Sequence, residues 1–561
     1  MRTSSLIRRI APRAGAIICF AVASSASAQQ RPAARPLPTT PEGVEALTNE
    51  RREDPRPAPA RREGEGPFPK LIIRGTMLID GTGAPPRGPV DIVIEGNRIT
   101  DIASVGYPKA PIDSTKRPKG PAREIDGTGL YVLPGLVDVH VHQGTQQKAP
   151  DSEYYNKLWL SHGITTVRGV PFASFEYSMK EKARSAKNEI TAPRYYVYQR
   201  PGTGWGQGPV RTPERARAWV RWIAQNGADG LKLGAERPDL MAALIDEAKK
   251  LGLGTTAHLQ QTGVAQMNAD EATRLGLGTI THFYGLFEAM YENNSVQPWP
   301  VDMNYNDEQG RFGQVARQWS LVKPKGEKWN ALLAKLKERD VTLDPTMVAY
   351  LTGRDMIHHM AAPWHASYTL PSLWDYYAPS RTNHGSYWYY WTTWDEVAWR
   401  NFYRVWMEFL NDYKNMGGRV TASSDAGFIY NTPGFSTVQE MELLQEAGFH
   451  PLEVIRSATF HAAETLTRPK GQEPDIGAVR PGMLADLMIV DHNPIENLKV
   501  LYGTGALKLN DETGKPEQVG GVRWTIKDGI IYDATQLLAD VAKMVEEQRR
   551  TRSVAGKAQP E

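Results

Sequence analysis

The chain has 561 residues, enough for more than one domain at roughly 150 residues per domain. Its net charge is +3, but residues 1–28 hold four arginines and no acids, which leaves about −1 for the rest. A near-neutral chain argues against nucleic acid or an anionic membrane as the main partner, because both favour basic surfaces.

Residues 1–28 are predicted to be a cleavable export signal. A basic start with four arginines precedes the apolar stretch 14–23, and a small-x-small cleavage site ends at Ala28. The apolar stretch is much shorter than the roughly 20 residues that cross a membrane. We expect a periplasmic or secreted protein with no membrane span, cleaved after Ala28, and the sequence leaves the Sec or Tat route open.

The composition after the signal limits the possible ligands. The one cysteine, Cys19, lies inside the signal, so the exported part has no disulfide and no thiolate. Any metal there must be held by His, Asp, Glu or a modified Lys. Residues 29–67 are rich in Pro, Arg, Glu and Ala without apolar periodicity, which predicts a disordered linker.

Short alternating strands occur near both ends of the chain. Those within 68–134 and 475–533 are joined by glycine and asparagine turns, and Asp528-Gly529 is a hairpin signal. We expect the two segments to form one composite β-sandwich domain. Residues 534–561 are predicted to be a C-terminal helix and tail.

Between them, residues 135–474 alternate strands with helices. Thr212 followed by proline opens one of these helices as an N-cap. Eight strands with helical intervals predict an α/β fold, a (β/α)8 TIM barrel. The candidate strands are 137–142, 164–170, 194–198, 230–233, 254–259, 279–283, 341–347 and 420–425.

An aromatic-rich insertion is predicted at about 285–415. This stretch holds ten of the fifteen tryptophans and is longer than barrel connections require. We expect it to lie over the barrel mouth. Most of its aromatic residues are expected to form a small core of their own, while a few line a pocket.

The most informative motif is Leu-Pro-Gly-Leu-Val-Asp-Val-His-Val-His over residues 133–142. Side chains alternate along a strand, so His140 and His142 project to the same side. Two imidazoles at the carboxyl end of a buried strand make half of a metal site, where a parallel barrel keeps its chemistry. The alternative is a solvated edge pair, against which the Pro-Gly entry and the valines count.

Four further residues fall at the ends of predicted barrel strands: Lys232, His258, His282 and Asp425. Singly, a strand histidine is more often a hydrogen-bonded core residue, and a strand-end Asp often caps a helix. Lys232 is unusual because burying an ammonium is costly. The ordered set of six polar residues on five strands is a specific pattern.

This set resembles the amidohydrolase superfamily, in its imidazolonepropionase-like and Xaa-Pro dipeptidase-like branch. Matching segments include 133–142, 162–168, 227–232 and 424–427, and the resemblance covers roughly residues 71–533 apart from the insertion. Thr281 departs from the pattern, since relatives often carry Glu before His282. That change would affect either hydrogen bonding around the ligands or the packing of the strand, and it removes no candidate ligand.

The resemblance implies a divalent metal centre, usually two Zn²⁺ per chain. His140, His142 and Asp425 would hold one ion, His258 and His282 the second, and an N-carboxylated Lys232 would bridge them. Asp425 would be the catalytic residue, accepting a proton as hydroxide attacks a carbonyl and returning it to the leaving nitrogen. Metal identity stays open, because such ligands also suit Mn, Co or Fe.

We therefore predict a hydrolase that cleaves the C–N bond of a dipeptide, N-acyl amino acid or cyclic amide. Alternatives are a lactone or ester hydrolase or a ring deaminase of the same superfamily, and a non-catalytic binding barrel. Lys232 counts against deaminases with mononuclear centres. Candidate groups for reading a substrate carboxylate are Arg200, Arg381 and Tyr284. The sequence leaves the oligomeric state open, a homo-oligomer included.

Overall fold

The protein was analysed as a computed structural model that describes residues 53–292, 297–304, 307–379 and 385–557. All of these belong to one compact unit. The predicted export signal, the linker up to residue 52 and the final residues of the tail lie outside the described residues.

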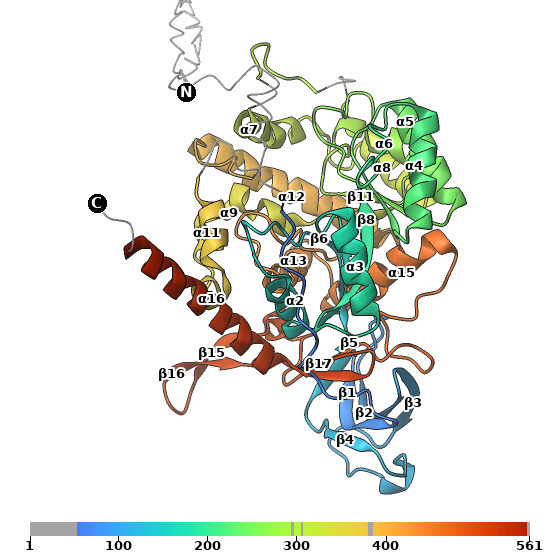
Figure 1. Cartoon of the computed structure of the whole chain (residues 1–561), viewed down its shortest axis with the longest axis vertical. Helices are drawn as coiled ribbons and strands as arrows, with labels where there is room; N and C mark the ends of the chain where they lie inside the picture. Colours follow the sequence, from blue (N-terminus) through green and yellow to red (C-terminus); the bar gives the residue numbers. More distant parts are fainter. Residues whose placement is uncertain (1–52, 293–296, 305–306, 380–384, 558–561) are drawn as a thin grey trace, which may run out of the picture. The chain divides into compact units, whose positions relative to one another are not determined.

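Eight parallel strands form a closed ring, with β6, β8 and β11 of this ring labelled in Figure 1. Neighbouring strands follow chain order, and the ring closes where Val141 bridges Ala426 and the Asp425 N–H donates to the His140 carbonyl at 2.8 Å. The predicted (β/α)8 barrel is confirmed. Its strands are β6 (Leu136–Val141), β7 (Ile164–Gly169), β8 (Arg194–Gln199), β9 (Gly230–Leu233), β10 (Gly254–Ala257), β11 (Thr279–Thr281), β12 (Thr342–Asp344) and β13 (Arg419–Val420).

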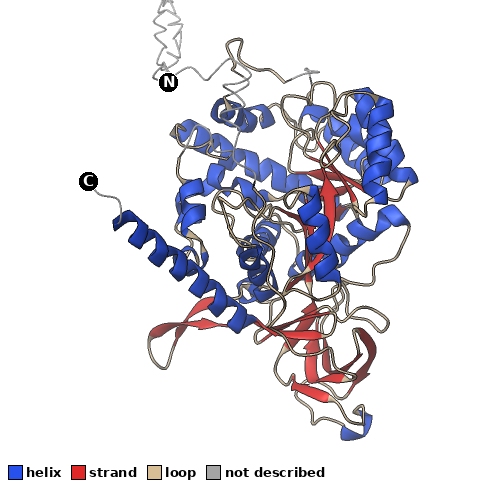
Figure 2. Cartoon of the chain, viewed as in Figure 1, coloured by secondary structure: helices blue, strands red, loops and turns tan. Residues whose placement is uncertain are grey.

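Helices connect and surround these strands (Figure 2). The predicted cap at Thr212 is present, because its hydroxyl accepts from the Arg215 N–H and Pro213 occupies the first turn. The barrel helices are α2 (Ser152–Ser161), α3 (Phe175–Ala186), α4 (Pro213–Gln225), α5 (Pro238–Lys250), α6 (Ala269–Arg274), α8 (Glu327–Glu338), α12 (Thr393–Asn415), α13 (Phe435–Glu446), α14 (Pro451–Ala458) and α15 (Phe460–Thr467).

A separate sheet combines strands from both ends of the chain. Strand β5 pairs antiparallel with β14, with Leu133 opposite Met488, so the early and late segments meet inside one sheet. Asp528 and Gly529 both have positive φ, as the predicted hairpin requires. The strands are β1 (Leu71–Leu78), β2 (Arg87–Glu95), β3 (Arg98–Ser104), β4 (Arg123–Asp126), β5 (Tyr131–Pro134), β14 (Leu487–Val490), β17 (Val522–Lys527) and β18 (Ile530–Asp533).

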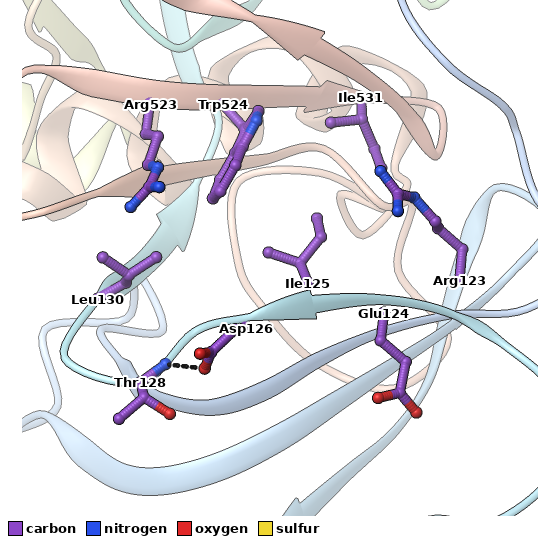
Figure 3. A pocket seen from close by; sticks show the side chains of 9 residues that line it. All are labelled: Arg123, Glu124, Ile125, Asp126, Thr128, Leu130, Arg523, Trp524 and Ile531. Atoms are coloured by element: carbon purple, nitrogen blue, oxygen red, sulfur yellow. Dashed lines mark hydrogen bonds between the residues drawn. The ribbon is translucent and has the colours of Figure 1, made fainter.

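The sheet branches at β1, which pairs first with β4 and then with β5. Between β4 and β17 the branch leaves a cavity of about 340 Å³ (Figure 3). Arg123 and Arg523 on its walls are ion-paired with Glu65 and Asp491. A second hairpin, β15 (Ala506–Asn510) with β16 (Lys515–Val519), forms its own two-stranded sheet.

Residues 53–67 correct the prediction of a disordered linker over 29–67. They run as an extended strap, with Ala58 buried and its N–H bonded to Glu181 at 3.0 Å. Glu65 and Ile531 exchange two backbone hydrogen bonds of 3.0 and 2.9 Å. The strap has few apolar residues, so composition suggested disorder, whereas its backbone groups are satisfied by the barrel and the sheet.

The insertion contributes α7 (Glu308–Trp319), α9 (Leu351–Met360), α10 (His365–Tyr368) and α11 (Pro371–Tyr377). Its aromatic residues do not form a separate small core: Phe312, Tyr387 and Trp399 belong to the same buried cluster as the barrel side chains. The Phe312 and Tyr387 rings stack with centroids 4.0 Å apart. The insertion is therefore anchored firmly on the barrel.

The terminal helix α16 (Ala534–Lys557) lies where the C-terminal helix and tail are predicted. Near its end, Arg552 pairs with Asp375 at 2.6 Å and Arg549 bonds the Ala366 carbonyl. These contacts hold it against the insertion. Within the described part of the chain, every helix lacks either the length or the apolar character that crossing a membrane requires.

Candidate metal centre

The six residues predicted from the sequence lie at the carboxyl ends of five barrel strands. His140 lies on β6 and Lys232 on β9, while His142, His258 and His282 directly follow their strands and Asp425 lies in the loop after β13. All but two are almost fully buried, with exposed fractions of 1% for His140 and 3% for Lys232 and His282. The complete set is His140, His142, Lys232, His258, His282 and Asp425.

Three of these side chains form a group suited to one metal ion. One donor atom each from His140, His142 and Asp425 lies within 4.8 Å of the other two. Asp425 Oδ1 is 3.2 Å from His142 Nε2 and 3.6 Å from His140 Nε2. The separations suit three donors around a common centre, and two imidazoles with one carboxylate are good ligands for zinc and related ions.

The remaining three lie directly beside this group. Lys232 Nζ is 3.3 Å from His140 Nε2, and the centroids of the His258 and His282 rings are 4.8 Å apart. His282 Nε2 lies 3.8 Å from Asp425 Oδ2. Asp425 thus has one oxygen toward the His140–His142 pair and the other toward the His258–His282 pair. Lys232 lies against the first of these pairs.

Hydrogen bonds set the orientation of the imidazoles. His142 Nδ1 donates to the Pro171 carbonyl at 3.0 Å and His140 Nδ1 donates to Asp344 at 3.2 Å. Carbonyl and carboxylate oxygens only accept, so Nε2 of each ring presents its lone pair to the cluster. This is the usual arrangement of metal-binding histidines.

Asp344 and Arg168 are functional residues that the sequence analysis missed. Asp344 ends β12, is fully buried, and accepts from Arg168 Nη2 at 3.3 Å as well as from His140. A signal existed, because Asp344 is a charged residue in the middle of the otherwise mostly apolar predicted strand 341–347. Arg168 on β7 also donates through Nε to the Val139 carbonyl at 2.5 Å.

The backbone at the cluster is strained. His282 and Asp425 have φ of 65° and 51°, and Thr346, which bonds His282 Nδ1, has φ of 46°. Non-glycine residues avoid this region, and such strain concentrates at functional sites. His282 makes this turn immediately after β11, and Asp425 makes it in the loop that follows β13.

Burial determines the charge of the candidate ligands. It lowers the pKa of His140 and His282 well below the ordinary value, so both are neutral and able to coordinate. Burial also lowers the pKa of Lys232 to about 7. Burial alone would raise the pKa of Asp425. The neighbouring imidazoles and Lys232 lower this pKa by more than burial raises it, so the carboxyl is ionised.

Aromatic side chains cover the second half of the cluster. Tyr284 stacks on His258 at 4.5 Å, and the Tyr350 ring is 5.4 Å from His282. Thr281, the departure noted in the sequence, bonds Thr256 Oγ1 at 2.7 Å between neighbouring strands. Its hydroxyl therefore links β11 to β10, and within the described residues it forms no hydrogen bond with the side chain of a candidate ligand.

The other histidines of the described chain have structural partners or lie away from the cluster. His365 bonds Thr369 and the His359 carbonyl, and His162 bonds the Leu158 carbonyl and packs on Phe435. Of the residues suggested to bind a substrate carboxylate, Tyr284 is buried and Arg381 lies outside the described residues. Arg200 is exposed, and its side chain already has an interaction partner.

Comparison with solved structures matches the whole barrel. A bottromycin amidohydrolase is 18% identical, with 90% of this chain and 95% of that chain covered and a TM-score of 0.55. An Xaa-Pro dipeptidase with bound methionine is 19% identical, with 83% and 100% covered and a TM-score of 0.53. The chain has the fold of these amidohydrolases, as the resemblance in its sequence predicted.

Sequence comparison matches a shorter segment. An adenine deaminase 2 of Rhizobium etli is 33% identical over 110 residues, which is 20% of this chain and 16% of that relative. The chain thus spans about a sixth of this curated relative. No protein-family model matches the chain.

Proposed function

We propose that this protein is an exported, metal-dependent amidohydrolase that hydrolyses the C–N bond of a small substrate such as a dipeptide, an N-acyl amino acid or a cyclic amide. The observation that carries the proposal is the convergence of four histidines, Lys232 and Asp425 at the carboxyl end of the barrel. Structures with the same fold are named as dipeptidase and amidohydrolase, which supports the reaction class.

In this proposal His140, His142 and Asp425 would hold one divalent ion, and His258 and His282 would hold a second. Lys232, as an N-carboxylated lysine, would supply a carboxylate-like ligand between these two groups of residues. Its neutral amine can react with CO2, and burial favours that neutral form. When bound, the ions, which we expect to be zinc, supply Lewis acidity toward a carbonyl oxygen and a water acidic enough to attack at neutral pH.

Asp425 is the proposed general acid and base. Its two oxygens face His142 and His282 at 3.2 and 3.8 Å, so the carboxylate lies between both halves of the cluster. Because it is ionised, it can accept a proton from the attacking water and return it to the leaving nitrogen. The residues of this chain otherwise orient the substrate and exclude water.

A ring deaminase is the second candidate, because the segment shared with the Rhizobium etli relative belongs to an adenine deaminase. Lys232 favours the amide hydrolase over the deaminase, since a lysine among metal ligands suits a bridged pair of ions better than a single ion. Ester or lactone hydrolysis would use the same groups. Export follows from the signal over residues 1–28 and supports a role in scavenging or detoxification outside the cytoplasm.

The test is metal content and hydrolysis measured on the protein beginning at Gln29. We expect about two ions per chain after zinc loading and cleavage of dipeptides or N-acyl amino acids. Asp425→Asn should lower kcat by roughly 10²-fold or more, because the proton acceptor is lost. One ion or none in the wild type, or adenine deamination without amide hydrolysis, would reject the proposal.

A further inference from the structure

Arg311 lies on the insertion and contacts the loop after β10, the loop that begins with His258. It stands in the first turn of α7, and its side chain is half-buried. Its guanidinium bonds Gln261 Oε1 at 3.4 Å, and its carbonyl accepts from Gln261 Nε2 at 3.5 Å. Gln261 follows His258 by three residues and is itself buried. This contact holds α7 against the loop that carries a metal ligand.

Ring contacts also connect the neighbour of Arg311 in sequence, Phe312, to Tyr284, two residues after His282. Tyr284 stacks on His258 at 4.5 Å, and Phe312, next to Arg311, lies 6.4 Å from the Tyr284 ring. Arg311 is therefore one side chain removed from the candidate centre, on the side of His258.

The guanidinium of Arg311 is poorly satisfied. Within the described part of the chain its one acceptor is the amide of Gln261, no carboxylate forms an ion pair with it, and its Nε atom is buried without a partner. Buried donors are almost always paired, and a guanidinium with unsatisfied donors is suited to bind an anion. Arg317 on the same helix is ordinary by comparison, since it pairs with Asp395 at 2.9 Å.

We propose that Arg311 binds the carboxylate of the substrate, which makes this site selective for dipeptides or N-acyl amino acids with a free carboxylate over neutral cyclic amides. The inference rests on the proposed function for the location of the scissile bond. A guanidinium presents parallel donors that match a carboxylate, and the partial burial of Arg311 strengthens such a charged hydrogen bond. Gln261 keeps the side chain in place when the site is empty of substrate.

The test is a binding measurement that does not depend on turnover. Zinc-loaded wild type, Arg311→Met and Arg317→Met are titrated by calorimetry with L-leucine, L-proline and L-methionine, and with the matched amino alcohols, which lack the carboxylate. Arg317→Met is the control, because it removes a cation of the same helix that is already paired with Asp395.

We expect the wild type to bind the amino acids about 10- to 100-fold more tightly than the amino alcohols, in keeping with a hydrogen bond between charged groups. Arg311→Met should abolish this difference and leave amino alcohol binding unchanged, while Arg317→Met should keep it. Amino acids that bind no better than the alcohols in the wild type, or a preference that survives in Arg311→Met, would overturn the inference. Metal content and hydrolysis test the proposed function separately.

Discussion

His140 Nδ1 and Asp344 Oδ2 lie 3.2 Å apart at the centre of the barrel, although 204 residues separate them in sequence. Asp344 accepts at the same oxygen from Arg168 Nη2, and its other oxygen accepts from Thr421 Oγ1 at 3.0 Å. The carboxylate is thus fixed by two other strands while it holds the imidazole. We interpret Asp344 as a positioning residue for His140.

Asp344→Asn tests this role. The amide cannot retain the negative charge that aligns His140 and balances Arg168, so we expect metal affinity to fall by roughly 10- to 100-fold. Affinity is measured by competition with a chromogenic chelator. Asp340→Asn is the matched control, because Asp340 precedes the same strand at the opposite end of the barrel and pairs with Arg419. Unchanged affinity in Asp344→Asn, or an equal loss in both variants, would contradict the role.

Lys232→Met tests the bridge. Methionine fills much of the same volume but cannot react with CO2, so we expect the metal content to fall from about two ions to about one per chain. Wild-type protein loaded with zinc should gain its second ion faster when bicarbonate is added, and the variant should show no such effect. Elemental mass spectrometry measures both. Two retained ions in Lys232→Met would show that the lysine is not a bridge.

Much of the barrel and its candidate site could be predicted because the relevant signals are local. Strands of alternating or continuous apolar residues recur between helix signals, and each of the six site residues stands at a strand end. In a parallel barrel all those ends meet at one face, so position along a strand also predicts position in space. His140 and Asp425 are far apart in sequence but lie together for this reason.

The features that the sequence did not reveal depend on contacts between distant segments. Arg168 and Asp344 form an ion pair across the barrel, and the sequence around either residue gives no indication of its partner. The strap over 53–67 is ordered by backbone bonds to the barrel and sheet, which composition does not record. The aromatic residues of the insertion join the barrel core because Trp399 on α12 packs against Phe283, which follows β11, and Phe312 packs beside Tyr350.

Glu288 predicts a pH dependence of stability. Burial raises its pKa to about 8, while in the unfolded chain it titrates near 4.5. Between these values the unfolded state has lost the proton that the folded state keeps, so stability falls as pH rises, by on the order of 4 kcal/mol. Glu288→Gln removes this titration. We expect its thermal midpoint to gain on the wild type between about pH 5 and about pH 8.

Glu292→Gln is the control for this comparison, because Glu292 is exposed four residues further along. Its midpoint should follow the wild type at every pH. If the difference between Glu288→Gln and the wild type stays constant with pH, Glu288 does not titrate on unfolding as proposed.

Gly254 on β10 is required by the ring of Tyr198 in the barrel interior. A Cβ atom at this position would overlap the Tyr198 hydroxyl and lie 2.6 Å from Cζ. Tyr198 is buried and stacks beneath the Arg168 guanidinium at 4.8 Å, so it has little room to move. We expect Gly254→Ala to lower the free energy of unfolding by about 1–3 kcal/mol through overpacking. Gly206→Ala, which meets no neighbour within 4 Å, should leave it nearly unchanged, and urea denaturation monitored by tryptophan fluorescence distinguishes the two. Equal stability of both variants would show that the barrel interior absorbs the extra methyl group.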